Sequence, residues 1–158
     1  MEKTNVMRIL EQKNIPYTAH TYPHEEGVAV DGVTVAQAMG QDPECVFKTL
    51  VARGASKAVY VFAIPVADNL DLKKAARAAG EKSIEMVHVK EINALTGYIR
   101  GGCSPVGMKK AYHTFFHETA EIVDRIAVSA GKIGFQVELD PADLLALTGG
   151  ALADLTVA

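Results

Sequence analysis

The stretch that decides the fold is Cys45-Val46-Phe47-Lys48-Thr49-Leu50-Val51-Ala52, an apolar run rich in β-branched residues that a single lysine interrupts. This composition favours a buried β-strand, which we predict over residues 46–52. Side chains alternate along a strand, so Val46, Lys48 and Leu50 should share one face. Burying an unpaired ammonium costs roughly several kcal/mol. Lys48 therefore either extends its amine to the sheet edge or stands in a polar cleft that holds an anion.

The second informative segment is the loop Gly101-Gly102-Cys103-Ser104-Pro105-Val106-Gly107. Its glycines permit positive φ and expose backbone N–H groups, while Pro105 restricts the turn. A cation beside a rigid loop of amides is typical of an anion or oxyanion site. The ordinary alternative for such a composition is a tight turn between a strand and a helix.

The rest of the chain mixes helical and strand patterns without regular βαβ alternation. Capping signals support several helices, for example Thr4 before the first, Asp71 and Gly80 around the third, and Asp140-Pro141 before the last. This order predicts a mixed α/β domain with a curved, substantially antiparallel mixed sheet flanked by helices. Helices are predicted over 5–13, 34–39, 72–79, 90–95 and 141–147, and strands or extended segments over 17–22, 46–52, 58–64, 84–87, 98–100, 113–116, 126–129 and 133–139.

Bulk composition indicates one compact domain over residues 1–158, because 49% of the residues are hydrophobic and no long polar tract interrupts them. No apolar stretch approaches the roughly 20 residues that span a membrane, and the N-terminal residues lack a signal pattern. We therefore expect a cytosolic protein that does not bind membranes. Cys45 and Cys103 are too few for a disulfide framework, so reduced thiols are expected.

The charge balance limits the ways in which the protein can bind nucleic acid. A net charge of −3 argues against broad, sequence-independent binding, which relies on neutralising many phosphates. Any contact with RNA must therefore be local, and solvated helix faces are the alternative explanation for each basic cluster. The candidate patches are Lys73, Lys74, Arg77 and Lys82, then Lys109 and Lys110, then Lys132.

Neither a metal site nor a catalytic cysteine is expected. His20 and His24, and likewise His113 and His117, have a spacing of four that would suit a metal on a helix, but neither pair lies in a convincing helical pattern. Solvated or capping histidines are the preferred interpretation. Cys103 has no identifiable orienting partner for a thiol nucleophile, so we interpret it as a small hydrophobic residue.

Several segments together resemble the YbaK/EbsC family, and the resemblance runs from about Thr4 to the C-terminus. The members of this family are free-standing relatives of the editing domain inserted in bacterial prolyl-tRNA synthetases. The resemblance implies the fold class given above, and the YbaK branch removes cysteine wrongly attached to proline tRNA. The matching segments are Val46-Phe47-Lys48-Thr49-Leu50, Asp71-Leu72-Lys73-Lys74, Thr96-Gly97-Tyr98, Gly101 to Pro105, and Ser129-Ala130-Gly131-Lys132.

The same resemblance implies roles for individual residues. The family lysine matching Lys48 is required for editing, either by holding the terminal-adenosine phosphate or by polarising the ester. The loop matching Gly101 to Pro105 binds the aminoacyl end, so Gly101 and Gly102 join Lys48 as expected catalytic residues. This chain departs from the family at Gln136, where aspartate is frequent, and near Asp31, where a bulky aromatic is frequent. The expected substrate-binding residues are Tyr22, Thr49, Cys103, Ser104, Pro105, Ser129 and Gln136.

The expected function is hydrolysis of mischarged Cys-tRNA(Pro) by an aminoacyl-tRNA deacylase that needs no cofactor. In the family the substrate's own thiol attacks the ester, which fits a chain without an evident nucleophile. One alternative is a deacylase for another small aminoacyl ester, such as Ala-tRNA(Pro), that uses a bound water. Another is a non-catalytic module that binds tRNA or prolyl-tRNA synthetase. The sequence leaves the oligomeric state and the need for a synthetase partner open.

Overall fold

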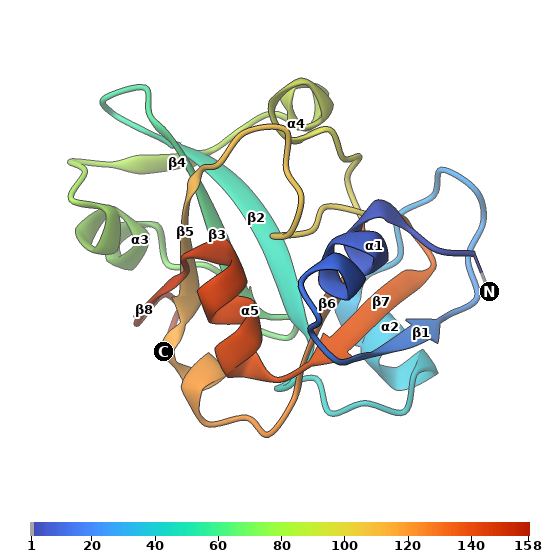
Figure 1. Ribbon diagram of the computed structural model, residues 1–158. Coiled ribbons are helices and arrows are strands. Elements are labelled where there is room, and N and C mark those ends of the chain that lie inside the picture. The colour runs from blue at the N-terminus through green and yellow to red at the C-terminus, as the bar shows by residue number, and fades with distance from the viewer. Residues whose placement is uncertain (1) are drawn as a thin grey trace.

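The computed structural model describes residues 2–158, which fold into two linked sheets with helices packed against them (Figure 1). A short 3-10 turn, Glu118–Glu121, follows the strand His113–His117. The helices are α1 (Asn5–Gln12), α2 (Gly32–Ala38), α3 (Leu72–Ala79), α4 (Val89–Thr96) and α5 (Pro141–Thr148). The strands are β1 (Tyr17–Thr21), β2 (Phe47–Gly54), β3 (Val59–Pro65), β4 (Ile84–Met86), β5 (His113–His117), β6 (Ile126–Ser129), β7 (Phe135–Leu139) and β8 (Ala151–Ala153).

One sheet has the strand order β1-β7-β6 and is antiparallel throughout, and the other has the order β4-β2-β3-β5-β8. In the second sheet β2 pairs antiparallel with β3 and β4, whereas β3–β5 and β5–β8 are parallel. The sheets meet where Val46 forms a bridge with Ala127, whose N–H donates to the Cys45 carbonyl oxygen at 2.9 Å. The mixed α/β class with a largely antiparallel sheet is therefore confirmed.

This junction leaves one edge of β2 partly uncovered. On that edge β4 pairs with the far end of the strand, Ala52–Gly54, and the bridge to β6 lies at the near end, at Val46. Between 47 and 50, no strand within residues 2–158 pairs with this edge. The predicted strand over 46–52 is confirmed, and its exposed edge carries Lys48.

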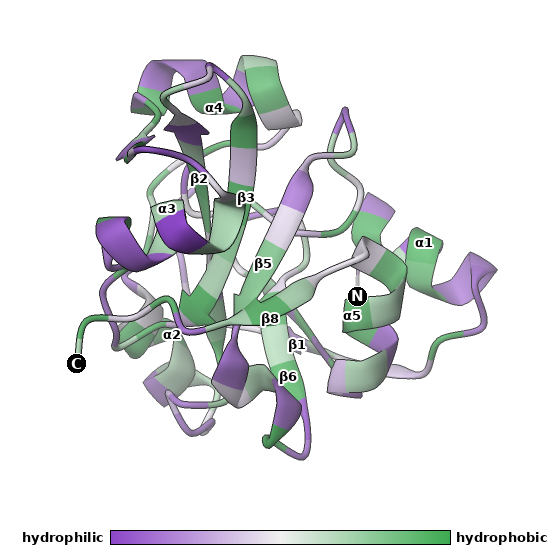
Figure 2. Ribbon diagram, turned by 90° about the vertical axis from the view of Figure 1, so that its left-hand side faces the viewer, coloured by the Kyte–Doolittle hydropathy of each residue, from purple (hydrophilic) through white to green (hydrophobic). Residues whose placement is uncertain are grey.

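Helices cover both sheets with apolar faces. Val6, Met7 and Leu10 of α1 are buried against β6 and β7 in the larger core cluster. Ala75 and Ala76 of α3 pack in a second cluster that contains side chains of β2 and β3. Figure 2 shows hydrophobic residues along β3 and β5, with hydrophilic residues on α3. No helix in the part of the chain that the structure describes has the length and hydrophobicity needed to cross a membrane.

The predicted caps are confirmed where side chains accept helix N–H groups. Thr4 accepts from Met7, Asp71 from Lys73 and Lys74, and Asp140 from Ala142. The second helix starts earlier than predicted, at Gly32 rather than at residue 34. The reason is that the Asp31 carboxylate accepts from the N–H groups of Val33 and Thr34, so the cap lies three residues upstream.

Three strand predictions need correction. Residues 98–100 form no strand, because the Tyr98 N–H donates to Thr96 Oγ1 and the Ile99 carbonyl accepts from Gly102, so the backbone bonds locally. The last long strand begins at Phe135 rather than at residue 133, because the Phe135 N–H closes a turn onto the Lys132 carbonyl. The short strand β8 was not predicted, since three small residues give little periodicity.

Candidate functional site

A cavity of about 460 Å³ opens beside the uncovered edge of β2 and has a volume typical of small-molecule sites. Four parts of the chain form it: β2, the loop before α2, the glycine loop, and the facing ends of β6 and β7. Of the expected site residues, the ones that line this cavity are Tyr22, Lys48, Thr49, Gly101, Cys103, Ser129 and Gln136. Residues separated by more than 100 positions thus meet at one place.

Lys48 is half-buried in this cavity, with no ion pair to a carboxylate elsewhere in residues 2–158. Burial lowers the pKa of its ammonium, because removing water disfavours the charged form. The carboxylates of Asp68 and Asp31 act in the opposite direction but do not cancel the effect of burial on this pKa. The cleft interpretation of Lys48 is therefore favoured over simple extension into solvent, and the cavity offers a cation that an anionic group can approach.

Two buried polar atoms in the cavity lack a hydrogen-bond partner within the described chain: Thr49 Oγ1 and Gln136 Oε1. Gln136 is 7% exposed and lies in the middle strand of its sheet, opposite His20 of β1 and Ser129 of β6. An unsatisfied buried polar atom costs about 1–3 kcal/mol, so such groups mark places where a ligand completes the bonding. Both are acceptor atoms, and both are covered in this structure, so a ligand would reach them only after their side chains turn towards the cavity.

The glycine loop forms the opposite wall. Gly101 has φ 86°, and a Cβ there would lie 2.8 Å from Ala29 Cβ, so only glycine fits. The Gly102 N–H donates to the Ile99 carbonyl at 3.0 Å, whereas the N–H groups of Gly101 and Cys103 have no acceptor among residues 2–158. The two loop residues that line the cavity, Gly101 and Cys103, therefore have backbone N–H groups that no other part of the described chain engages.

The remaining expected residues of the loop lie on its side away from the cavity. Gly102, Ser104 and Pro105 do not line the cavity. Ser104 is fully buried, and its Oγ accepts from the Val106 N–H at 3.2 Å. A Cβ on Gly102 would lie 3.2 Å from the Ile133 nitrogen, so this residue packs against the turn between β6 and β7. Their contribution in this geometry is to fix the loop.

Cys103 is 9% exposed, and burial raises the pKa of its thiol to about 11. A hydrogen bond with Thr96 acts in the opposite direction on this pKa but is the weaker influence. The thiol is consequently neutral near pH 7, and a neutral thiol is a poor nucleophile. This state agrees with its interpretation as a small hydrophobic residue.

The family assignment rests on the whole sequence rather than on the cavity. A family model described as "Aminoacyl-tRNA editing domain" matches residues 27–147. The chain belongs to this family. The resemblance to YbaK/EbsC proteins stated from the sequence motifs is thereby confirmed, and the matched range contains all of the cavity's residues except Tyr22.

Relatives of this editing domain are known in sequence and in structure. A protein of Enterococcus faecalis named "Putative Cys-tRNA(Pro)/Cys-tRNA(Cys) deacylase EbsC" is 45% identical over 155 residues, which are 98% of this chain and 94% of the relative. The crystal structure of "a putative trans-editing enzyme for prolyl tRNA synthetase" is 26% identical, with a TM-score of 0.83 and complete coverage of both chains. A crystal structure of a hypothetical protein, 20% identical, covers 96% of this chain and 99% of its own with a TM-score of 0.84, and shows the same fold.

Two charged residues of the editing-domain cavity were not among the expected site residues, although Asp31 was noted as a departure from the family. Asp31 caps α2 and also lines the cavity, where its pKa is lowered first by the hydrogen bond from the Thr34 hydroxyl. Arg100 lies at the cavity rim directly before the glycine loop. Its position before Gly101 was the available signal, but the wrong strand prediction for 98–100 obscured it.

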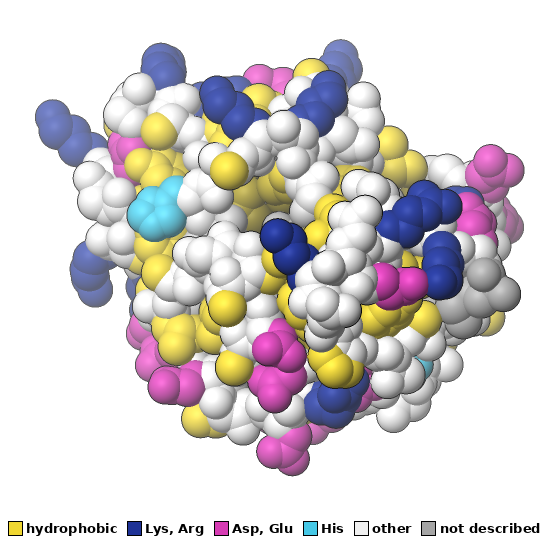
Figure 3. Space-filling model, viewed as in Figure 1, with side chains coloured by type: hydrophobic (Ala, Val, Ile, Leu, Met, Phe, Trp, Pro, Cys, Tyr) yellow, Lys and Arg dark blue, Asp and Glu magenta, His cyan; other side chains and the backbone are white. Residues whose placement is uncertain are grey.

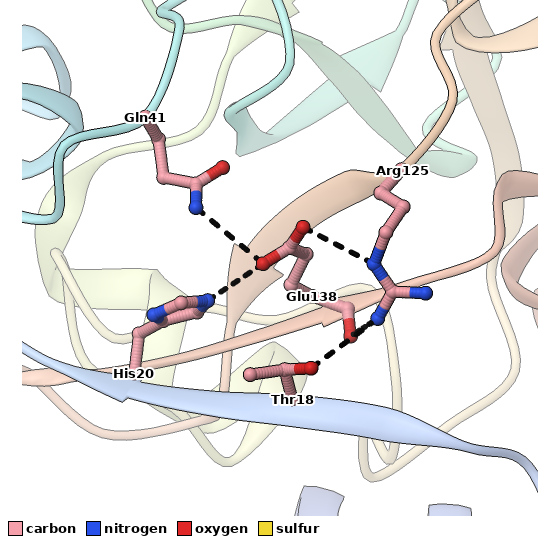
Figure 4. A network of polar contacts seen from close by, with 5 residues as sticks. All are labelled: Thr18, His20, Gln41, Arg125 and Glu138. Carbon is pink, nitrogen blue, oxygen red and sulfur yellow. Dashed lines mark hydrogen bonds and ion pairs between the residues drawn. The ribbon is translucent and has the colours of Figure 1, made fainter.

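Of the four histidines considered for a metal, three lie on strands and His24 follows β1; His117 is buried and accepts from the Leu155 N–H, so the expected solvated or capping role is wrong for this residue. His20 is in β1 and binds Glu138 Oε1 at 2.7 Å, within a network that also contains Arg125 and Gln41 (Figure 4). His113 and His117 belong to β5. The histidines therefore do not form the helical pairs that a metal on a helix would need.

Basic side chains do not form a continuous stripe on the face drawn in Figure 3, where separate lysines and arginines are spread mostly over the upper half and the right, and most carboxylates lie lower down. Two members of the predicted basic patches are engaged in ion pairs. Lys74 lies 3.0 Å from Asp154, and Lys132 lies 2.9 Å from Glu2. This distribution agrees with a local contact to RNA rather than a broad electrostatic surface.

Proposed function

We propose that this protein is an aminoacyl-tRNA deacylase that hydrolyses mischarged Cys-tRNA(Pro) in trans. The observation that carries the proposal is the half-buried Lys48 ammonium, which faces a cavity together with the unengaged amides of Gly101 and Cys103. The names of the Enterococcus faecalis relative and of the 26% identical structure support the choice of reaction and substrate.

The reaction needs an environment that stabilises negative charge on the ester carbonyl. The N–H groups of Gly101 and Cys103 are donors of the kind that stabilise an oxyanion, and such a donor is typically worth about 100- to 1,000-fold in rate. Lys48 supplies the positive charge, either to the carbonyl or to the phosphate of the terminal adenosine. Thr49 and Gln136 also line the cavity, and each has a buried oxygen without a partner in the described chain, so both are candidates to hydrogen-bond the substrate's ammonium or thiol once their side chains turn towards it.

The nucleophile in this proposal is the thiol of the substrate. Its sulfur forms a bond to the ester carbonyl carbon, the bond from that carbon to the ribose oxygen breaks, and the thiol proton ends on the ribose hydroxyl. The product is a cyclic thiolactone, which water then opens to free cysteine. The neutral thiol of Cys103 supports this assignment, because the protein's own cysteine is a poor competitor. The protein contributes orientation and charge stabilisation.

The need for such an enzyme follows from the size of the amino acids. A pocket built for proline discriminates weakly against cysteine, since small differences in apolar bulk are worth about 1–3 kcal/mol. A second site that selects a chemical property, here the thiol, removes the remaining errors. The proposed partner is the aminoacylated acceptor end of tRNA, with prolyl-tRNA synthetase as a second partner that co-sedimentation would test.

The decisive experiment is a deacylation panel over Cys-, Ser-, Ala- and Pro-tRNA(Pro). We expect rapid turnover of the cysteinyl ester and nearly none of the seryl ester, although the two differ by one atom. A hydroxyl is far less ionised than a thiol near pH 7, so it needs a base that the mechanism does not supply. Comparable rates for cysteine and serine would refute the thiol-assisted mechanism, and preferential turnover of Ala-tRNA(Pro) would refute the substrate assignment.

A further inference from the structure

A second cavity, of about 330 Å³, lies on the other side of the glycine loop. Three parts of the chain form it: the loop after β1, the segment after α4, and the turn between β6 and β7. No residue of the catalytic proposal lines it. Its walls consist of His24, Glu26, Gly27, Gly97, Tyr98, Ile99, Gly131, Lys132 and Ile133.

The glycine loop that lines the first cavity packs against the turn that lines the second. A Cβ on Gly101, which lines the first cavity, would lie 3.5 Å from Ile133 Cγ1, which lines the second. A Cβ on Gly102 would lie 3.2 Å from the Ile133 nitrogen and 3.3 Å from Lys132 Cα. A chain molecule that fills the first cavity and continues past the glycine loop therefore reaches the second cavity next.

The second cavity combines flat apolar surface with one cation. Tyr98 and His24 contribute rings, and the Ile99 side chain is 49% exposed although it is large and apolar. The Lys132 ammonium is half-exposed and lies 2.9 Å from both carboxylate oxygens of Glu2. An exposed ion pair of this kind is worth about 0–1 kcal/mol, so a phosphate can replace the Glu2 carboxylate.

We propose that this cavity binds the nucleotide that precedes the terminal adenosine of the tRNA acceptor strand. The proposal rests on the proposed function, which places the aminoacylated adenosine in the first cavity. Rings and apolar side chains suit a base, since single-stranded RNA is held mainly by stacking and by local phosphate contacts. Lys132 pairs with the phosphate that links the two nucleotides. The penultimate nucleotide of tRNA is a cytidine, and the Glu26 carboxylate is an acceptor of the kind that binds the exocyclic amine of cytosine.

Binding of uncharged RNA tests the proposal without any turnover. The probe is a fluorescent acceptor-stem hairpin with a single-stranded 3′ end, whose penultimate nucleotide is intact or abasic. We expect the abasic hairpin to bind the wild-type protein about 5- to 150-fold more weakly, the range that loss of one stacked base produces. Lys132→Ala should weaken binding of the intact hairpin and reduce the slope of log affinity against log salt by about 0.7. Lys3→Ala is the matched control, because Lys3 also forms an exposed ion pair, with Glu11, but lines neither cavity.

A minimal substrate separates the two cavities. The cysteinyl ester of adenosine alone lacks the penultimate nucleotide, so Lys132→Ala should hydrolyse it at the wild-type rate while losing activity towards Cys-tRNA(Pro) through a higher KM. Lys48→Ala should lose both activities. Equal binding of the intact and abasic hairpins would overturn the proposal, as would an equal loss by Lys132→Ala on both substrates. Base-dependent binding by a protein that hydrolyses no cysteinyl ester would instead refute the proposed function alone.

Discussion

Lys48 occupies a position that destabilises the fold, which is a reason to assign it a function. Because burial lowers the pKa of its ammonium, the folded protein holds this proton less tightly than the unfolded chain does. The free energy of unfolding should therefore rise as pH increases from the folded pKa to the unfolded pKa of this lysine. At neutral pH, where Lys48 is charged in both states, its burial lowers stability.

The first prediction concerns replacement of this lysine by an apolar side chain of similar length. Lys48→Met should unfold at the same or a higher urea concentration than the wild type at pH 7, and the difference should shrink towards pH 10. Deacylation of Cys-tRNA(Pro) should fall by at least about 100-fold, as expected for loss of a charge that stabilises the transition state. A folded variant with undiminished turnover would remove Lys48 from the mechanism.

The second prediction separates the backbone of the glycine loop from its one thiol. Cys103→Ala keeps the Cys103 N–H group, so we expect kcat within about threefold of wild type, since truncating a small side chain at the cavity wall costs little. The measurement is single-turnover deacylation, with circular dichroism to establish folding. Lost activity in a folded variant would revive the thiol-nucleophile hypothesis.

At the scale of elements, the glycine loop depends on a backbone conformation that other residues adopt at a cost. Gly101→Ala introduces a Cβ at φ 86° that lies 2.8 Å from Ala29 Cβ, so the loop must move away from the loop before α2. We expect unfolding free energy to fall by about 1–3 kcal/mol and kcat to fall by at least about tenfold. Gly80→Ala is a suitable control, because this helix C-cap has φ 72° and nothing within 4 Å of its added Cβ. Gly80→Ala should lose stability and keep kcat. If both variants lost kcat equally, the loss could not be attributed to the glycine loop.

The strand that carries Gln136 is fixed further along by Glu138, which binds His20 of β1 and Arg125 before β6 (Figure 4). Burial alone would raise the pKa of Glu138, but the hydrogen bonds from His20 and Arg125 outweigh burial and lower it. A carboxylate with a lowered folded pKa stabilises the fold above its unfolded pKa, and this stabilisation is lost as pH falls through the folded value.

The second element-level prediction concerns Glu138→Gln. At pH 7 the substitution should lower the free energy of unfolding by about 1–3 kcal/mol, because charge-assisted hydrogen bonds are lost. Between about pH 5 and pH 3 the wild type should lose stability more steeply than the variant, since only the wild type protonates this carboxyl group. Urea unfolding of both proteins from pH 7 to pH 3 measures the stability difference and its change with pH. If the two proteins lost stability equally as pH falls, ionisation of Glu138 would contribute nothing.

At the scale of the whole molecule, local chemistry determined what could be predicted. The helix Leu72–Ala79 was predicted with its observed bounds, because Asp71 and Gly80 cap it by their own side-chain and backbone properties. The cavity was predicted through residues carried by the family motifs, and Lys48 was found independently as a charge in an apolar strand. Long-range contacts could not be predicted. β8 is defined by parallel pairing with β5 more than 30 residues away. One local feature was also missed, because the Gly102 N–H closes a turn onto Ile99 in a segment whose sequence suggested a strand.

The C-terminal segment, which lies beyond the range of the family match, packs into the core. Leu155 is fully buried, its N–H donates to His117 Nδ1 at 3.1 Å, and its carbonyl accepts from Asp71 at 2.8 Å. Leu155→Ala should lower the free energy of unfolding by about 2–4 kcal/mol through the cavity that it creates. Turnover per folded molecule should be unchanged, because the residue lines neither cavity. Chemical denaturation measures the change in stability, and the deacylation rate divided by the concentration of active sites measures turnover. A reduced kcat would show coupling between the C-terminal segment and the catalytic site.

The uncovered edge of β2 has a second consequence, for solubility. An open edge of apolar, β-branched residues is a template on which strands of other molecules can add, and a charged residue on such an edge discourages this addition. Thr49 and Leu50 are partly exposed on this edge, and Lys48 is the charge beside them. The ammonium proposed to stabilise the ester's transition state would thus also discourage aggregation. Solutions of Lys48→Met should therefore scatter more light on storage, although the monomer unfolds at the same or a higher urea concentration.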